Sequence, residues 1–141
     1  GYVAYICGKN DSVKVSSSKP SESWTYLIVS KYGANRLTDV TWSNATFTDA
    51  YLPAKAEMET IITNLWEDSS SRQWKIFSDG SSTSSNWDYY WTATADDADS
   101  SKAYYASVTT NSNVTGTYAG LVTSTKNKTE TLKAIGVSYI K

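Results

Sequence analysis

The chain contains no histidine and only one cysteine, Cys7, among its 141 residues. Without histidine, Ser-His-Asp and Cys-His catalytic arrangements, histidine general bases and histidine-based zinc sites are excluded within this chain. A lone thiol cannot form an intrachain disulfide, and no histidine or second cysteine is present to activate it or to resolve its oxidation. Cys7 is therefore expected to be a buried structural residue.

Long apolar runs and an excess of one charge are also missing. The longest apolar stretches, such as residues 26–29, fall far short of the roughly 20 residues that cross a bilayer, so no membrane insertion is expected. Thirteen basic and fourteen acidic residues leave a formal net charge of −1. With no basic cluster, nucleic acid is not an expected partner. No signal peptide precedes Gly1, so the chain is expected to be a trimmed mature or C-terminal domain.

Aromatic residues are abundant, with six tryptophans and eleven tyrosines. Large rings bury much area each, so a chain with few leucines and phenylalanines can still close a core. The length fits one domain over residues 1–141.

The hydrophobic pattern predicts strands and one clear helix. Strand-like runs rich in β-branched and aromatic residues cover residues 3–7, 13–15, 24–30, 88–95, 102–108 and 132–140. From Ala54 the apolar residues follow one face of an α-helix up to Trp66, and Pro53 suits its first turn. A short or irregular helix is expected around residues 39–47. The predicted class is α+β, mostly antiparallel β-sheet with one or two helices.

The order of these segments carries a resemblance. Leu52-Pro53 with Glu57 matches a Leu-Pro-x-x-x-Glu helix start, and Trp42 with Ala45 matches a Trp and Ala pair of the helix before it. The run from Asp88 to Ala95, the run from Lys102 to Val108 and the final run to Ile140 then follow as strands. The chain thereby resembles the C-type-lectin-like domain of bacterial and phage surface proteins, of the kind that closes collagen-like adhesins.

The resemblance implies ligand binding or adhesion on a cell surface or virion, outside the cell. The expected partner is a protein or carbohydrate on a host or neighbouring cell, and no cofactor is expected. Formylglycine-generating enzymes share this fold and use active-site cysteines, but the second cysteine is missing here. The chain is therefore not expected to be an enzyme.

Period-two alternation sorts the two central strands by face. Trp91, Ala93 and Ala95 are expected in the core with Tyr104, Ala106 and Val108. The other face and its loop predict an exposed aromatic and polar platform, a composition typical of paratopes. The predicted ligand-binding residues are Asn86, Trp87, Tyr90, Thr92, Asp96, Asp97, Tyr105 and Ser107. Packing of these tyrosines in a second core layer is the alternative.

Acidic residues offer two further interpretations. Asp96, Asp97 and Asp99 place three carboxylates in one loop, which suits calcium, but the EF-hand spacing with its glycine and distal glutamate is absent. A solvated acidic loop is the main interpretation, and calcium is the alternative. Glu57 is expected to be a solvated or capping glutamate.

Two other roles stay open at this stage. The residues from Asp79 to Thr117 are dense in Asn, Ser, Asp, Thr and Tyr, a composition that adenine-directed mutation produces in the variable proteins of diversity-generating retroelements, which share this fold. The other role is a structural or oligomerisation module, such as a pilin tip or tail-fibre knob, whose aromatic surface meets another subunit.

Overall fold

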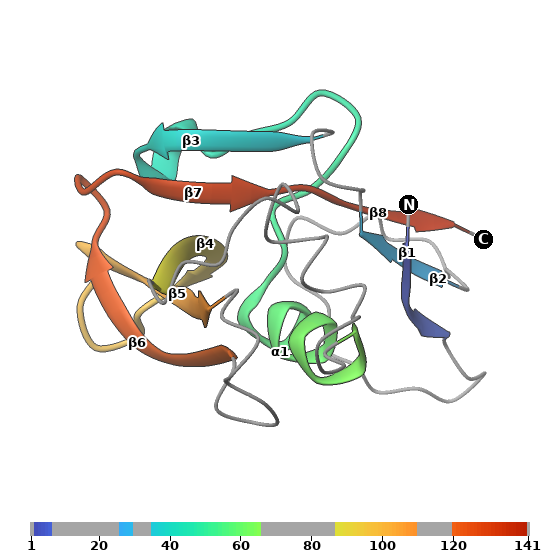
Figure 1. Cartoon of the computed structure of the whole chain (residues 1–141). Helices are drawn as coiled ribbons and strands as arrows, with labels where there is room; N and C mark the ends of the chain where they lie inside the picture. The colour runs from blue at the N-terminus through green and yellow to red at the C-terminus, as the bar shows by residue number, and fades with distance from the viewer. Residues whose placement is uncertain (1, 7–25, 30–34, 66–86, 110–119, 141) are drawn as a thin grey trace.

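The computed structural model describes residues 2–6, 26–29, 35–65, 87–109 and 120–140 (Figure 1). These residues form eight strands, one α-helix and one short 3-10 helix. The prediction of a mostly β, α+β chain is confirmed. The strands expected at residues 13–15 and the environment expected for Cys7 lie outside the described residues. No helix in the described part of the chain combines the length and apolar character needed to cross a membrane.

The strands make two sheets. The three-stranded sheet has the order β1 (Tyr2–Ile6), β2 (Tyr26–Val29), β8 (Val137–Ile140). The five-stranded sheet has the order β3 (Arg36–Val40), β7 (Leu132–Ile135), β4 (Trp87–Ala95), β5 (Lys102–Thr109), β6 (Gly120–Asn127). Neighbouring strands are antiparallel except for β4 and β7, which are parallel. The described sheets are therefore mostly antiparallel, as the sequence predicts.

The helix α1 (Lys55–Leu65) begins one residue later than the apolar pattern suggests, which places Ala54 at the N-cap. Glu57 accepts a hydrogen bond from the Ala54 N–H at 2.8 Å, so it is the glutamate half of a capping box. In a complete capping box the N-cap side chain also accepts a hydrogen bond from a helix N–H, but Ala54 has no hydroxyl to do so. Thr94 of β4 provides an acceptor at this end of the helix, since its Oγ1 accepts a hydrogen bond from the Lys55 N–H at 2.9 Å. Glu57 is a buried capping residue and not a solvated one.

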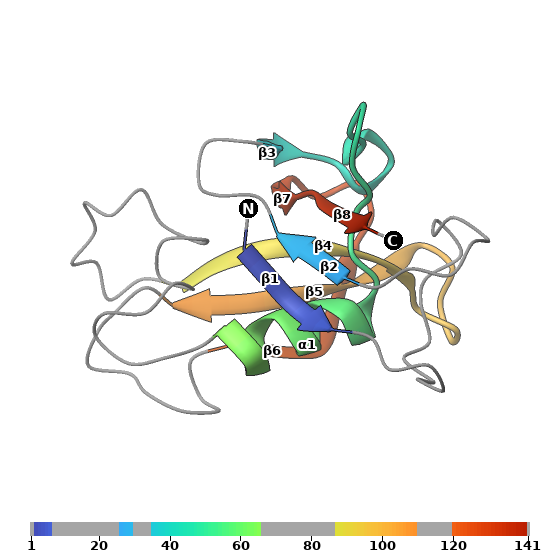
Figure 2. The same ribbon diagram turned by 90° about the vertical axis from the view of Figure 1, so that its right-hand side faces the viewer.

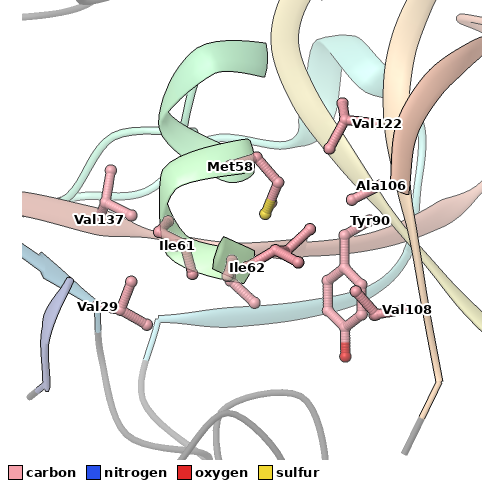
Figure 3. Close-up of a cluster of buried hydrophobic side chains, with 10 residues drawn as sticks. Val29, Met58, Ile61, Ile62, Tyr90, Ala106, Val108, Val122 and Val137 are labelled. Carbon is pink, nitrogen blue, oxygen red and sulfur yellow. The ribbon is translucent and has the colours of Figure 1, made fainter. Parts of the chain in front are cut away.

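One core cluster lies where α1 meets both sheets. Figure 3 shows Met58, Ile61 and Ile62 of α1 beside Val29 and Val137 of the small sheet. The large sheet contributes Tyr90, Ala106, Val108 and Val122. The helix contacts β1 of the small sheet and β4, β5 and β6 of the large sheet, and Figure 2 shows α1 beside β5 and β6 with β1 crossing toward it. Burial of this helix therefore ties the two sheets together.

A second core cluster covers the opposite face of β4. Trp91 is fully buried, as the alternation predicts, but it packs with Ala103, Leu132 and Ala134, whereas Ala106 and Val108 belong to the cluster beneath α1. Ala93 and Ala95, which were expected in the core, are only partly buried. The Trp91 indole N–H donates to the carbonyl oxygen of Val40 at 2.9 Å.

A second indole hydrogen bond runs in the opposite direction, from the segment just after Val40 to β4. Trp42 opens the 3-10 helix η1 (Trp42–Asn44), the short irregular helix expected in this region, and its Nε1 donates to the Thr92 carbonyl at 2.8 Å. The two indole bonds join β4 to a segment about fifty residues earlier in the chain.

Gly136 separates β7 from β8, which the sequence predicts as one strand. β7 pairs within the large sheet and β8 within the small one, so this short run passes from one sheet to the other (Figure 1). A Cβ atom at Gly136 would lie 2.8 Å from the Cβ of Ala50 and 3.1 Å from the Cβ of Asn35. The glycine is needed because the 45–52 loop and residue 35 approach the backbone closely here.

Truncation of Trp91 tests the second cluster. Trp91→Ala is expected to lower the free energy of unfolding by about 3–5 kcal/mol, as for other large-to-small core changes. Trp91→Phe is the matched variant: it keeps a ring but leaves the Val40 carbonyl without its donor, and it should cost about 1–3 kcal/mol. Urea denaturation measures both, and an unchanged midpoint for Trp91→Ala would contradict the assignment.

A second variant tests the contact at Gly136. Gly136→Ala is expected to destabilise the protein by about 1–3 kcal/mol, because the new methyl group overlaps a short, rigid side chain. The same change made in an Ala50→Gly background should cost less, because the nearest overlapping atom is gone. Thermal melts of the two single variants and the double variant give this coupling, and equal costs in both backgrounds would show that Ala50 is not the obstacle.

Candidate functional site

The pairing of β4 with β5 decides which predicted binding residues share a face. Tyr90 pairs with Ala106, and Trp91 pairs with Tyr105. Paired residues lie on the same face of a sheet, so Tyr90 and Tyr105 lie on opposite faces. The prediction that these two tyrosines form one platform is wrong. Tyr90 is only 3% exposed and packs in the cluster beneath α1.

Thr92 is also buried, which contradicts its predicted place on an exposed surface. Its hydroxyl donates to the Tyr104 carbonyl at 2.9 Å. The physical reason is that β4 lies between β7 and β5 and is covered on both faces. A strand buried on both faces loses its alternation. The adjacent rings of Tyr90 and Trp91, with no polar residue between them, are the sequence signal of this burial.

Tyr105 and Ser107 do lie on one face, and Tyr89 joins them there. Tyr89 pairs with Ser107, and its ring meets the Tyr105 ring edge to face at 5.5 Å and 81°. Tyr89 is 39% exposed, the only large hydrophobic residue among those described that counts as exposed. Tyr89 was not among the predicted binding residues because strand alternation alone placed the exposed ring one residue later.

The neighbouring strand β6 extends this face. Ser124 pairs with Tyr105, and Lys126 pairs with Ala103. The Lys126 ammonium lies 5.2 Å from the centroid of the Tyr89 ring and 5.1 Å from that of Tyr105. Both distances are within the range of a cation–π contact. We call the residues Tyr89, Tyr105, Ser107, Ser124 and Lys126 the tyrosine–lysine patch.

Glu130 holds the lysine of the patch from the other side. Its Oε1 lies 3.8 Å from the Lys126 ammonium, and its Oε2 accepts the Asn127 N–H at 3.1 Å. An exposed ion pair of this kind contributes little stability. The lysine head therefore contacts the Glu130 carboxylate and both rings at once.

The aspartates of the loop between β4 and β5 bond to their own turns. Asp96 accepts the Ala98 N–H at 2.9 Å. Asp99 accepts the Ser101 N–H at 3.0 Å and the Ser101 hydroxyl at 2.6 Å. Asp97 is exposed. Within the described ranges, no group of three His, Cys, Asp or Glu residues could hold a metal ion. Turn formation therefore accounts for Asp96 and Asp99.

Two predicted binding residues cannot be placed. Asn86 lies outside the described residues, and Trp87 is described only by its backbone, as the first residue of β4. Their contribution to a binding surface stays a prediction.

Comparison with known proteins gives no relative. No family model matches the chain, and neither a curated protein nor a solved structure matches it. The described residues define a mostly β, α+β protein with one helix. The patch has the groups for non-covalent recognition: two phenol rings, two serine hydroxyls and a cation on adjacent strands.

Titration of Asp99 tests the loop geometry. The hydrogen bond from the Ser101 hydroxyl, the Ser101 N–H and then the nearby Lys102 lower the pKa of Asp99. A lowered pKa in the folded state means that the ionised Asp99 carboxylate stabilises the turn near neutral pH. This stabilisation is lost as the pH falls through the folded-state pKa. Ser101→Ala should raise the pKa of Asp99 toward its usual range, as followed by carboxyl NMR. Ser138→Ala, in β8, is the control and should not shift it. An unchanged titration in Ser101→Ala would contradict the geometry.

Proposed function

We propose that the chain is a non-catalytic ligand-binding or adhesion domain of a bacterial or phage surface protein, with a C-type-lectin-like fold. The single observation that carries this proposal is the tyrosine–lysine patch on β4, β5 and β6. The domain acts outside the cell, and the patch binds a protein on a host or neighbouring cell.

The positions of the resembling residues support the fold assignment. Leu52 and Pro53 lie just before Ala54, the N-cap of α1, and Glu57 caps that helix from a buried position. A glutamate with this structural task is what a Leu-Pro-x-x-x-Glu helix start requires. The two tyrosine-rich runs form the adjacent strands β4 and β5, and the last run ends the chain in β7 and β8.

The chemistry of the patch supports recognition of a protein. Tyrosine rings offer a large contact area at a small cost in conformational entropy, and serine hydroxyls add adaptable hydrogen bonds. The edge-to-face contact between Tyr89 and Tyr105 fixes the rings before any partner arrives. Lys126 lies beside both rings and pairs with Glu130, and its positive charge favours an acidic group on the partner.

The arrangement of the patch across the sheet also supports recognition of a protein. Its residues come from three neighbouring strands of one sheet and so extend across the sheet. Extended protein–protein contacts use such surfaces, whereas small molecules are held in clefts.

A binding experiment with matched lysine variants tests the proposal. The wild-type domain is used to capture partners from a host cell-surface extract, and the affinity of the recovered partner is then measured by calorimetry. Tyr89→Ala should weaken binding by about 2 kcal/mol or more, roughly thirtyfold, as for a central aromatic anchor. Its fold should persist, because exposed side chains contribute little to stability.

Lys126→Ala and Lys133→Ala provide the control. Both variants remove one positive charge, but Lys133 lies on β7 and pairs with Asp88 at 3.0 Å, away from the two rings. Only Lys126→Ala should weaken binding. Equal affinity of Tyr89→Ala, Lys126→Ala and the wild type would refute a role for the patch. If light scattering instead showed a dimer that Tyr89→Ala dissociates, the partner would be a second copy of the chain, and the domain would be an oligomerisation module.

A further inference from the structure

Strand β6 lies at an edge of the large sheet and carries the lysine of the tyrosine–lysine patch. In the strand order of that sheet β6 comes last, so β5 is its only neighbour among the described strands. The side chains of Thr123, Ser124 and Asn127 are exposed along it. The edge of a sheet presents backbone N–H and C=O groups with which another extended segment can pair. We call residues 123–128 the β6 edge.

The pairing with β5 shows which backbone groups of the β6 edge face outward. The Lys128 N–H donates to the Ser101 carbonyl at 2.9 Å, so these residues form a hydrogen-bonded pair of the antiparallel ladder. Hydrogen-bonded and non-hydrogen-bonded pairs alternate along such a ladder. The register continues without a shift to Thr125, which lies opposite Tyr104 in a non-hydrogen-bonded pair. The N–H and C=O of Thr125 therefore face away from β5.

Two lysines of the β6 edge lie over aromatic rings. Lys126 contacts the Tyr105 ring, and the Lys128 ammonium lies 4.3 Å from the centroid of the Trp42 ring. Tyr105 and Trp42 pack against the same core cluster, so both lysines lie on the same side of the sheet. Two residues of an extended chain span about 6–7 Å, which is the spacing of the two lysine backbones. Among the described residues, no acidic side chain forms an ion pair with Lys128.

Glu130 shows which kind of group the β6 edge accepts. Its Oε2 accepts a hydrogen bond from the Asn127 N–H at 3.1 Å, while its Oε1 lies 3.8 Å from the Lys126 ammonium. One carboxylate therefore contacts both a backbone donor and a cation of this edge. Because an exposed ion pair contributes little stability, a carboxylate from another chain can replace Glu130 at small cost.

We propose that the β6 edge binds an extended acidic segment of the protein partner. The segment lies beside β6 as a further strand and forms hydrogen bonds with the backbone of Thr125. Alternate side chains of a strand lie on one face at the same repeat as the two lysines. Two acidic residues separated by one residue therefore lie opposite Lys126 and Lys128, where cross-strand side chains interact.

The charge of the β6 edge favours an acidic partner over a second copy of the chain. Residues 120–127 contain a lysine and no acidic residue, and Lys128 follows them. Pairing of two β6 edges would bring lysines together with no acidic residue of either strand to compensate them. This use of β6 rests on the proposed function, because the lysine of the patch is one of the two cations.

Titration with synthetic peptides tests the proposal without a captured partner. The probe is a short, end-capped threonine–valine peptide with two glutamates separated by one residue, added to the ¹⁵N-labelled chain. It should shift the backbone amides of Thr123, Thr125 and Lys126 with a common, saturable dependence on concentration. A matched peptide with adjacent glutamates places them on opposite faces of a strand and should bind about fivefold more weakly. Equal affinity of the two peptides, or no saturable shift with either, would overturn the proposal.

A second pair of variants tests the backbone pairing. Thr125→Pro removes the outward N–H, and proline is tolerated in an edge strand where its N–H would face solvent. Peptide binding should fall at least about tenfold, the value of a lost hydrogen bond whose partner stays buried. Thr125→Val keeps the N–H and should bind as the wild type does. The amide spectrum of Thr125→Pro checks its fold, and a backbone N-methylated peptide, which should not bind the unaltered chain, makes the same test from the ligand side. Wild-type affinity in either case would overturn strand pairing.

Charge variants locate the two carboxylates of the segment. Lys126→Gln and Lys128→Gln should each weaken peptide binding about fivefold, whereas Lys133→Gln removes the same charge on β7 and should not. Glu130→Gln removes the resident negative charge and should strengthen binding about twofold. An equal loss in Lys133→Gln and Lys128→Gln, or weaker binding in Glu130→Gln, would contradict the assignment.

Failure of this proposal is distinguishable from failure of the proposed function. If a captured partner loses affinity for Tyr89→Ala while neither peptide binds, the patch recognises a protein and the acidic segment is refuted. If Tyr89→Ala and Lys126→Ala leave the captured partner unaffected, the proposed function is refuted whatever the peptides do. A dimer in light scattering whose formation protects the Thr125 amide from hydrogen exchange would assign the β6 edge to a second copy of the chain and overturn the acidic segment.

Discussion

The arrangement of the described residues depends on how the far end of β4 is hydrogen-bonded. At residues 91–95 the pairing of β4 with β5 shifts, and the groups released there bond to the segment between β3 and α1. The Thr92 carbonyl accepts the Trp42 indole, the Ala93 N–H donates to Pro53, and Thr94 caps α1 at Lys55. A β-bulge of this kind leaves backbone groups without ladder partners, and buried ones must find partners elsewhere. Here they position the helix start and the 3-10 helix together.

Much of this fold follows from local pattern. The helix was predictable because its apolar residues repeat on one face and a proline and glutamate mark its start. Strands β4 and β5 were predictable from dense aromatic residues. Strands β3 and β6 were not predicted, and both depart from regular alternation. Asn35 and Asp39 at β3 have positive φ angles of 47° and 53°, conformations that asparagine and aspartate tolerate better than other non-glycine residues. The pairing of β6 shifts between Tyr105 and Ser107 of its neighbour.

The candidate site was harder to predict because strand register is a long-range property. Alternation within β5 correctly separates Tyr105 from Ala106, but it does not say which residue of β4 lies opposite. A displacement of one residue exchanges the two faces of a strand. The face of β4 that was predicted to be exposed holds Tyr90, whereas the exposed ring is that of Tyr89, on the other face. The cation of the patch lies on β6, and no local pattern connects β6 to β4.

The three-stranded sheet has a mechanical consequence. Strands β1 and β8 both pair with β2, and Tyr2 is opposite Val29 at one end while Ile140 is opposite Tyr26 at the other. A force applied between Tyr2 and Ile140 therefore pulls β1 and β8 lengthwise past β2 in opposite directions. All hydrogen bonds of each pair then share the load, instead of breaking one after another from an end. Because β4, β5 and β6 belong to the other sheet, tension applied at these two residues would reach the small sheet before it reaches the tyrosine–lysine patch.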